Sequence, residues 1–387
     1  MRSKSIVISG MVLGLATVGY SQVDVVSVAS ESGLDILFGG EVEMEFVDVE
    51  GPGGFTNQDL TYQKVKTRSP HMRIDKAILS ARANYSENLF YKIEFRFGDN
   101  KAFVDKHYAQ LKLPSINTEV EIGKNKPFMR TKRRTEGYPL IGTAFWKGRE
   151  YHIASKTELT LSDQIEIEGG LSFNMKRPLG SDDAAEDKSF KMIVYDDYDN
   201  KDGQTFEYGS TLTLKAFGLS AQGWYYTGEL IDDFDWKTQL SQTLAGYDDM
   251  GDRSDRTHWW YGGRGGFDRF GIHIRGEYIS AQDGLLPRDG YYVEGSYSLE
   301  TENFLPVQAV EPLFRYGTLN LRRHPPLLGE TESWDRTMTT VALLTRVNDY
   351  LTVKLEYYLL DEATGGDPPE DDHVKDNQLL LQVKYEF

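Results

Sequence analysis

A basic cluster between positions 124 and 149 is the part of this sequence whose residue types point most directly to chemistry. It contains eight Lys and Arg residues and one acid, Glu136, in a chain whose formal net charge is −17. An arginine fork can donate two parallel hydrogen bonds to a phosphate or a carboxylate, whereas lysine acts as a point charge. The cluster therefore predicts a binding site for small anions. Six of its members are our candidate ligands: Lys124, Lys126, Arg130, Lys132, Arg133 and Arg134.

Sequence signatures of enzyme catalysis are missing. No Gly-x-Ser-x-Gly, His-Glu-x-x-His or P-loop pattern occurs, there is no cysteine, and the seven histidines are scattered along the chain. We therefore expect a protein that is not an enzyme and that uses no metal and no cofactor.

The end of the chain has the residue pattern of an extended strand with two unlike faces. Between Asp376 and Phe387, apolar side chains alternate with polar ones, and the last residue is aromatic. Residues 91–97 and 351–359 alternate in a similar way, with charged or polar residues at every second position. Such charged positions cannot face lipid or a dry core, but they can face a water-filled lumen. The pattern predicts strands of a transmembrane barrel, and an edge strand of a soluble β-protein is the alternative.

Sixteen alternating segments can be placed along the chain, and we expect an all-β fold, a transmembrane antiparallel β-barrel of about 16 strands. The connections alternate between short turns and longer loops, which is typical of barrels with short periplasmic turns and long outer loops. The connections at 98–101 and 301–308 depart from this alternation. The predicted long loops are 50–71, 125–149, 175–205, 229–255, 281–289, 322–333 and 361–375. The predicted strands are 34–49, 72–85, 88–98, 101–113, 118–124, 150–162, 164–174, 206–217, 218–228, 256–267, 269–280, 290–300, 309–321, 334–346, 349–360 and 376–387.

Residues 1–21 have the features of a secretory signal peptide. Arg2 and Lys4 precede an apolar run, and small residues follow it. We expect cleavage after Ser21, so that residues 22–387 form a single outer-membrane β-barrel domain. The loss of two positive charges then changes the formal net charge from −17 to −19. A chain with this negative net charge is not expected to bind nucleic acid, which is itself negatively charged.

Three other patterns have a structural interpretation. We expect the glycine-rich run 262–266 to be a bend or bulge of the barrel wall rather than a phosphate cradle. The aromatic runs 224–226, 259–261 and 291–292 are interpreted as residues of the membrane interface, with sugar stacking as the alternative. The predicted outer loops around 181–202, 229–255 and 361–376 are strongly acidic, and we interpret them as solvated surface rather than as a calcium site.

Residues 123–128, Gly-Lys-Asn-Lys-Pro-Phe, resemble the Gly-Gln-Phe-Lys-x-Pro-Phe stretch of the phosphate-selective porins O and P, with one residue fewer. The segments 90–97 and 102–105 and the pair Gly148-Arg149 are similar too, so the resemblance covers about residues 72–152. Members of this family are sixteen-stranded, usually trimeric anion porins whose pores are lined by lysine and arginine. The resemblance implies that Lys126 takes the place of the lysine before Pro-Phe. By inward strand parity, further candidates for the pore wall are Arg82, Lys92, Arg96, Lys354 and Lys384.

We therefore expect a porin in the outer membrane of a Gram-negative-type bacterium, acting as a passive channel for small anions such as phosphate. The third outer loop, 124–149, would fold into the lumen and constrict it, because a basic constriction attracts anions. The expected partners are outer-membrane lipid, lipopolysaccharide, small anions and the other copies of a homotrimer. Four alternatives stay open. The loop could turn outward and bind lipopolysaccharide phosphates, or the chain could be a general or carbohydrate-conducting porin, a structural or adhesive barrel, or a rim-located enzyme.

Overall fold

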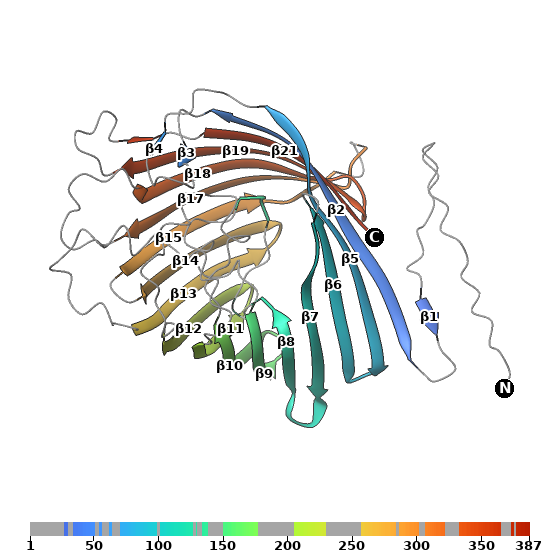
Figure 1. Cartoon of the computed structure of the whole chain (residues 1–387). Coiled ribbons are helices and arrows are strands. Elements are labelled where there is room, and N and C mark those ends of the chain that lie inside the picture. The colour runs from blue at the N-terminus through green and yellow to red at the C-terminus, as the bar shows by residue number, and fades with distance from the viewer. Residues whose placement is uncertain are drawn as a thin grey trace.

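The structure of the chain, a computed structural model, is shown in Figure 1. The predicted signal peptide and most of the three acidic loops lie outside the residues that it describes. Among the described residues, no helix is long and apolar enough to cross a membrane. The described residues are 27–29, 34–50, 54–55, 62–63, 70–98, 101–126, 129, 134–137, 150–176, 205–229, 257–283, 286–301, 306–321, 333–364, 373–374 and 377–387.

One sheet contains nineteen of the described strands, of which three are short: β1 (Ser27–Ala29), β16 (Leu299–Glu300) and β20 (His373–Val374). The other sixteen form the wall of a barrel. A separate two-stranded sheet pairs β3 (Gly54–Phe55) with β4 (Tyr62–Gln63), and η1 (Pro114–Ile116) is a single 3₁₀ turn. The wall strands are β2 (Asp35–Glu50), β5 (His71–Ser86), β6 (Leu89–Gly98), β7 (Lys101–Leu113), β8 (Thr118–Asn125), β9 (Glu150–Ser162), β10 (Ile165–Lys176), β11 (Thr205–Ala216), β12 (Leu219–Glu229), β13 (Thr257–Arg269), β14 (Ile272–Asp283), β15 (Leu286–Tyr297), β17 (Ala309–Leu321), β18 (Ser333–Arg346), β19 (Leu351–Thr364) and β21 (Asn377–Glu386).

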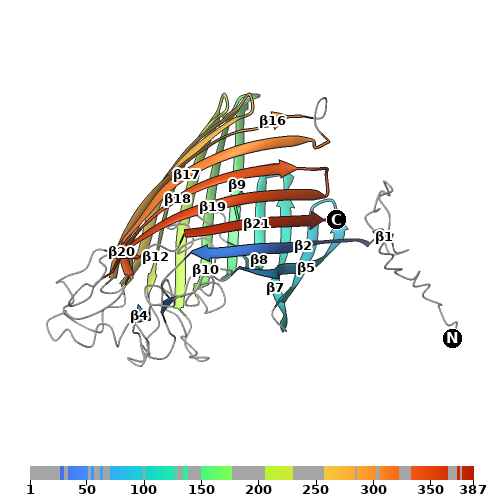
Figure 2. The ribbon, with the colours of Figure 1, turned by 90° about the horizontal axis from the view of Figure 1, so that it is seen from above.

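The wall closes on itself. Each wall strand pairs antiparallel with its neighbours along the chain, and the first strand, β2, pairs with the last, β21. The views in Figures 1 and 2 show β2 lying between β21 and β5, with the C-terminus at the end of the barrel opposite β20. Closure leaves no unpaired sheet edge, which confirms the predicted sixteen-stranded antiparallel barrel.

The connections follow the predicted asymmetry with one correction. Short turns join the strands at one end, for example at residues 87–88, 163–164 and 270–271. The predicted long loop 281–289 is wrong, because β14 continues to Asp283 and β15 already begins at Leu286. The register continues without a break to the pair Asp283 and Leu286, so the hairpin extends beyond the point where the apolar alternation stops.

The two faces of the wall differ in polarity. Large apolar side chains point outward, such as Leu171 at 65% exposure and Ile153 at 54%. Charged side chains point inward and are buried, such as Arg315 and Glu356. An apolar outward face of this extent matches the lipid-facing band of a transmembrane barrel, and the inward charges require partners in the lumen.

The glycine-rich run 262–266 lies within β13 and forms no bulge. The pairing of β13 with β12 and with β14 continues through it without a register shift. At the inward position Gly262, a Cβ would lie 2.4 Å from the ring of Trp224. The glycine therefore leaves room for an aromatic side chain packed on the inner face of the wall.

Candidate functional site

The described residues 129 and 134–137 of the connection between β8 and β9 lie inside the barrel. Gly123 lies within β8, two residues before its end, with φ +139°, and a Cβ there would lie 2.3 Å from the carbonyl oxygen of His107. Only glycine permits this close pairing near the end of the strand. The described loop residues, Met129 and 134–137, then contact inward side chains of five wall strands.

Two hydrogen bonds from inward arginines hold the loop backbone. The Arg264 guanidinium of β13 donates to the carbonyl oxygen of Met129 at 2.8 Å, and the Arg315 guanidinium of β17 donates to that of Gly137 at 2.8 Å. Both arginines originate from parts of the wall that are far from the loop in sequence. The loop therefore lies against the inner face on the side of β13 to β17.

A carboxylate on β19 fixes the loop at Glu136. The backbone N–H of Glu136 donates to both carboxylate oxygens of Glu356, at 2.8 and 3.0 Å, and the N–H of Gly137 donates to the Tyr358 hydroxyl at 2.6 Å. The Tyr358 hydroxyl in turn donates to Glu356. On β21, the Gln382 amide donates to the Glu136 carboxylate at 2.5 Å. Buried charge-assisted bonds of this kind are strong, and they make this segment a fixed part of the lumen.

Arg134 is the candidate ligand that the structure places inside the barrel. Its guanidinium bonds Glu294 at 3.2 Å and Ser296 at 2.7 Å, both on β15, and it pairs with Glu311 on β17. Partial burial lowers the pKa of Arg134 from its ordinary value, and Glu294 acts in the opposite sense. Arginine stays charged in proteins, so the group is a fixed cation in the lumen.

An apolar cluster also lies on the lumen side, where the sequence predicted water. Met129 of the loop is fully buried and packs in a cluster with Trp224, Tyr226, Trp260 and Tyr292. The ring of Tyr226 stacks on Trp260 at 4.5 Å between centroids, and the Trp260 indole donates to Glu207 at 2.6 Å. The interpretation of the aromatic runs as interface residues is thus wrong for these inward members. It fits their outward neighbours, which are exposed or only partly buried: Tyr225, Trp259, Tyr261 and Tyr291.

Toward the short-turn end, the inward side chains of the wall and Arg134 enclose a cavity of about 670 Å³. Nine charged Lys, Arg, Asp and Glu side chains line it, six of them basic. The basic ones are Arg134, Arg264, Arg275, Arg346, Lys354 and Lys384, and the acidic ones are Asp268, Glu311 and Glu386.

The glutamates that pair with two of the cavity arginines are more deeply buried than the arginines themselves. Arg264 donates a hydrogen bond to Glu277 at 2.6 Å, and Arg275 forms an ion pair with Glu294 at 2.9 Å. The two glutamate side chains are fully buried, whereas the arginine side chains are 12% and 17% exposed. The buried carboxylates therefore hold both arginines in place at the wall of the cavity.

The predicted ligands are divided between the two sides of the wall. Lys124 pairs in register with His107 and Tyr151, on the outward face that also carries Ile122 and Ile153. This register contradicts a role in the lumen for Lys124, because side chains alternate strictly along a strand. Lys126 lies one residue beyond β8 and is partly buried. Arg130, Lys132 and Arg133 lie outside the described residues, so their place in the site stays a prediction.

Sequence reasoning missed the arginines of the wall. The candidates Lys354 and Lys384, chosen by inward strand parity, line the cavity. The same reasoning did not select four inward arginines: Arg264, Arg275, Arg315 and Arg346. The signal was present, because each of these arginines lies at an inward position opposite a charged or polar residue of the neighbouring strand: Glu277, Glu294, Thr340 and Thr352.

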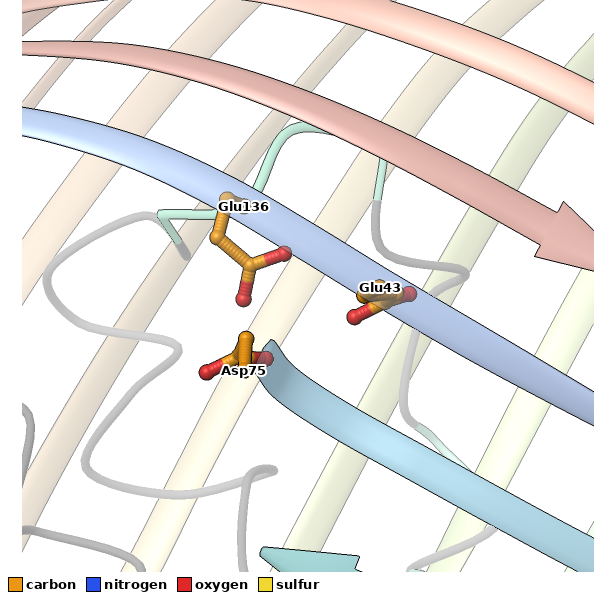
Figure 3. Close-up of side chains that lie close together, drawn as sticks. All are labelled: Glu43, Asp75 and Glu136. Atoms are coloured by element: carbon orange, nitrogen blue, oxygen red, sulfur yellow. The ribbon is translucent and has the colours of Figure 1, made fainter. Parts of the chain in front are cut away.

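Three carboxylates from separate segments meet beside the loop. Oxygen atoms of Glu43, Asp75 and Glu136 lie within 4.8 Å of one another, and Figure 3 shows the three side chains converging. Basic groups of β5 pair with two of them: Glu43 lies 3.2 Å from Lys76, and Asp75 lies 3.7 Å from Arg73. Glu136 of the loop therefore lies beside the ion pairs of β2 and β5, while its own carboxylate accepts a hydrogen bond from Gln382.

Comparisons with known proteins show the fold. No family model matches the sequence, and no curated protein matches it. The outer-membrane channel DcaP of Acinetobacter baumannii is similar over 93% of this chain and 99% of its own, with a TM-score of 0.61 and 11% identity. The fold is that of the outer-membrane porins.

Two further structures support this conclusion. An anion-selective porin from Comamonas acidovorans is similar over 92% of this chain and 100% of its own, with a TM-score of 0.57 and 9% identity. The trimer form of OmpT from Vibrio cholerae matches over 92% of this chain and 99% of its own, with a TM-score of 0.57 and 12% identity.

Proposed function

We propose that the chain is an outer-membrane porin that conducts small anions passively, with phosphate as the leading candidate solute. The observation that carries the proposal is the cavity, which is lined by six basic and three acidic side chains. A low-dielectric wall focuses the field of such a surface, which concentrates anions and repels cations. Transport of this kind needs no covalent step.

The loop supports the proposal as a pore-constricting segment. Arg134 brings a cation to the cavity, and the bonds of Glu136 and Gly137 fix the segment across several strands. Arg130, Lys132 and Arg133 belong to the same connection, and we place them in the proposed constriction. In the proposed constriction these side chains replace part of the hydration shell of the anion, and conduction requires that the anion is held weakly enough to leave.

The proposal also covers the oligomeric state of the protein and one alternative function. Since the similar OmpT of Vibrio cholerae was solved in a trimer form, we include a homotrimer in the proposal. A carbohydrate-conducting pore is disfavoured, because Trp224 and Trp260 are at most 5% exposed and offer no ring face to a sugar.

Flux into proteoliposomes tests the proposal. Vesicles containing the refolded chain are mixed with phosphate, with the uncharged sugar arabinose and with the cation choline, and entry is followed by light scattering or isotope uptake. When each rate of entry is divided by the rate for uncharged arabinose, we expect a higher value for phosphate than for choline. Equal or faster entry of choline would refute anion preference, and impermeability to all three would refute a porin.

A further inference from the structure

The outward face of β8 to β12 contains a narrow apolar groove of about 440 Å³. One row of paired residues explains its shape: Ser155 and Ser210 flank Leu171 in register, with Val120 and Tyr225 at the two ends. Small serine side chains alternate here with larger apolar ones. The wall is therefore hollowed between ridges on the side that faces lipid.

The rows nearer the loop end make the groove asymmetric. The next row joins Ile122, Ile153, Phe173 and Tyr208, all exposed and apolar or aromatic. Two residues farther along each strand, or roughly 7 Å, the row contains the cation Lys124.

In that row, Lys124 has polar neighbours on both sides. It is paired with His107 on β7 and with Tyr151 on β9, and the His107 imidazole lies 3.1 Å from the Tyr151 hydroxyl. Beyond Tyr151, the row continues with Met175 and Phe206. The apolar groove thus has a cationic, hydrogen-bonding end toward the outer loops.

This arrangement fits one kind of molecule. A lysine on the lipid-facing side of a barrel is strongly unfavourable at the bilayer midplane and is tolerated near the interface. Lys124 therefore belongs at the level of the lipid headgroups, where tyrosine is also favoured. A phosphate at that level would pair with the ammonium group, and an acyl chain would fill the apolar groove below it.

We propose that this groove binds a phosphorylated lipid of the outer leaflet. Its phosphate lies at Lys124, His107 and Tyr151, and an acyl chain lies along Ile153, Leu171 and Phe173. This site is on the opposite side of the wall from the anion cavity. It therefore does not depend on the proposed conduction.

Native mass spectrometry of the full barrel in a neutral detergent tests the site, with diphosphoryl lipid A as the probe. Lys124→Gln removes the cation, and Ser210→Trp fills the groove with a large apolar side chain. The matched control is Arg269→Gln, which removes an outward cation stacked on Phe270 at the opposite, short-turn end. Resistance of each barrel to unfolding by detergent at room temperature verifies that the variants fold.

We expect Lys124→Gln and Ser210→Trp each to weaken lipid A binding at least tenfold, and Arg269→Gln to stay within twofold of wild type. Millimolar inorganic phosphate should not displace the lipid, because the apolar tail supplies much of the binding. Wild-type affinity in both groove variants would overturn the proposal, and so would displacement by phosphate alone. Disulfide cross-linking of Ser210→Cys between two copies, with loss of lipid binding, would show that a second copy occupies the groove instead.

Discussion

The anchor between Glu356 and the backbone of Glu136 makes a quantitative prediction about the loop. In Glu356→Gln, one carboxylate oxygen becomes an NH₂ group, which cannot accept the N–H of Glu136. A hydrogen bond to a charged group contributes about 1.5–3 kcal/mol. Since about 1.4 kcal/mol corresponds to a factor of ten, the population in which this segment has left the wall should rise on the order of 10- to 100-fold.

A single engineered thiol can report that population. The chain has no cysteine, and Thr135 beside the anchor is fully buried, with its hydroxyl donating to the Gly137 carbonyl at 2.8 Å. In a Thr135→Cys background, the rate of reaction with a water-soluble thiol reagent measures how often the segment is released. Glu356→Gln should raise this rate at least tenfold.

The control for this experiment is Glu119→Gln. It removes an equivalent carboxylate from an exposed ion pair with Lys112 at 3.5 Å, where the expected contribution is small. Its labelling rate should equal that of the parent. A rate in Glu356→Gln within twofold of the parent would refute the argument that this carboxylate holds the loop in the lumen.

The other predictions concern selectivity and stability. Arg134→Glu should shift the reversal potential in a salt gradient toward cation preference, whereas Lys124→Glu on the outward face should leave it unchanged; equal shifts in both would contradict the register. Arg275→Gln should weaken block of chloride current by phosphate severalfold, since it removes a cavity cation, and unchanged block would exclude that group from the path. Trp260→Ala should destabilise the barrel by about 3–5 kcal/mol in denaturant unfolding within detergent, and the outward, 43% exposed Tyr261→Ala should cost clearly less.

The fold was predictable because alternation along a strand is a strong, local signal. Leu351 to Leu359 and Leu379 to Phe387 show which side chains face lipid, and closure then follows from the number of such strands. The end of β14 was missed because polar residues on both faces of Ala281 to Asp283 hide the period.

The site was predictable only in part, for two physical reasons. The basic cluster identified the loop, but the composition of a segment does not show which side of a strand a residue faces. Lys124 was therefore assigned to the lumen, although its register places it on the outward face. The contacts of Glu136 and Arg264 join residues more than a hundred positions apart, and no local pattern encodes such pairs. The buried aromatic cluster around Trp260 was missed because both faces of the strand carry aromatics there.

The reversal potential of the wild-type channel in a planar bilayer under a potassium chloride gradient tests the central claim most directly. The account predicts a potential of the sign set by chloride, because basic side chains outnumber acidic ones in the cavity. A potential of the sign set by potassium would contradict it, and it would mean that acidic groups control ion passage.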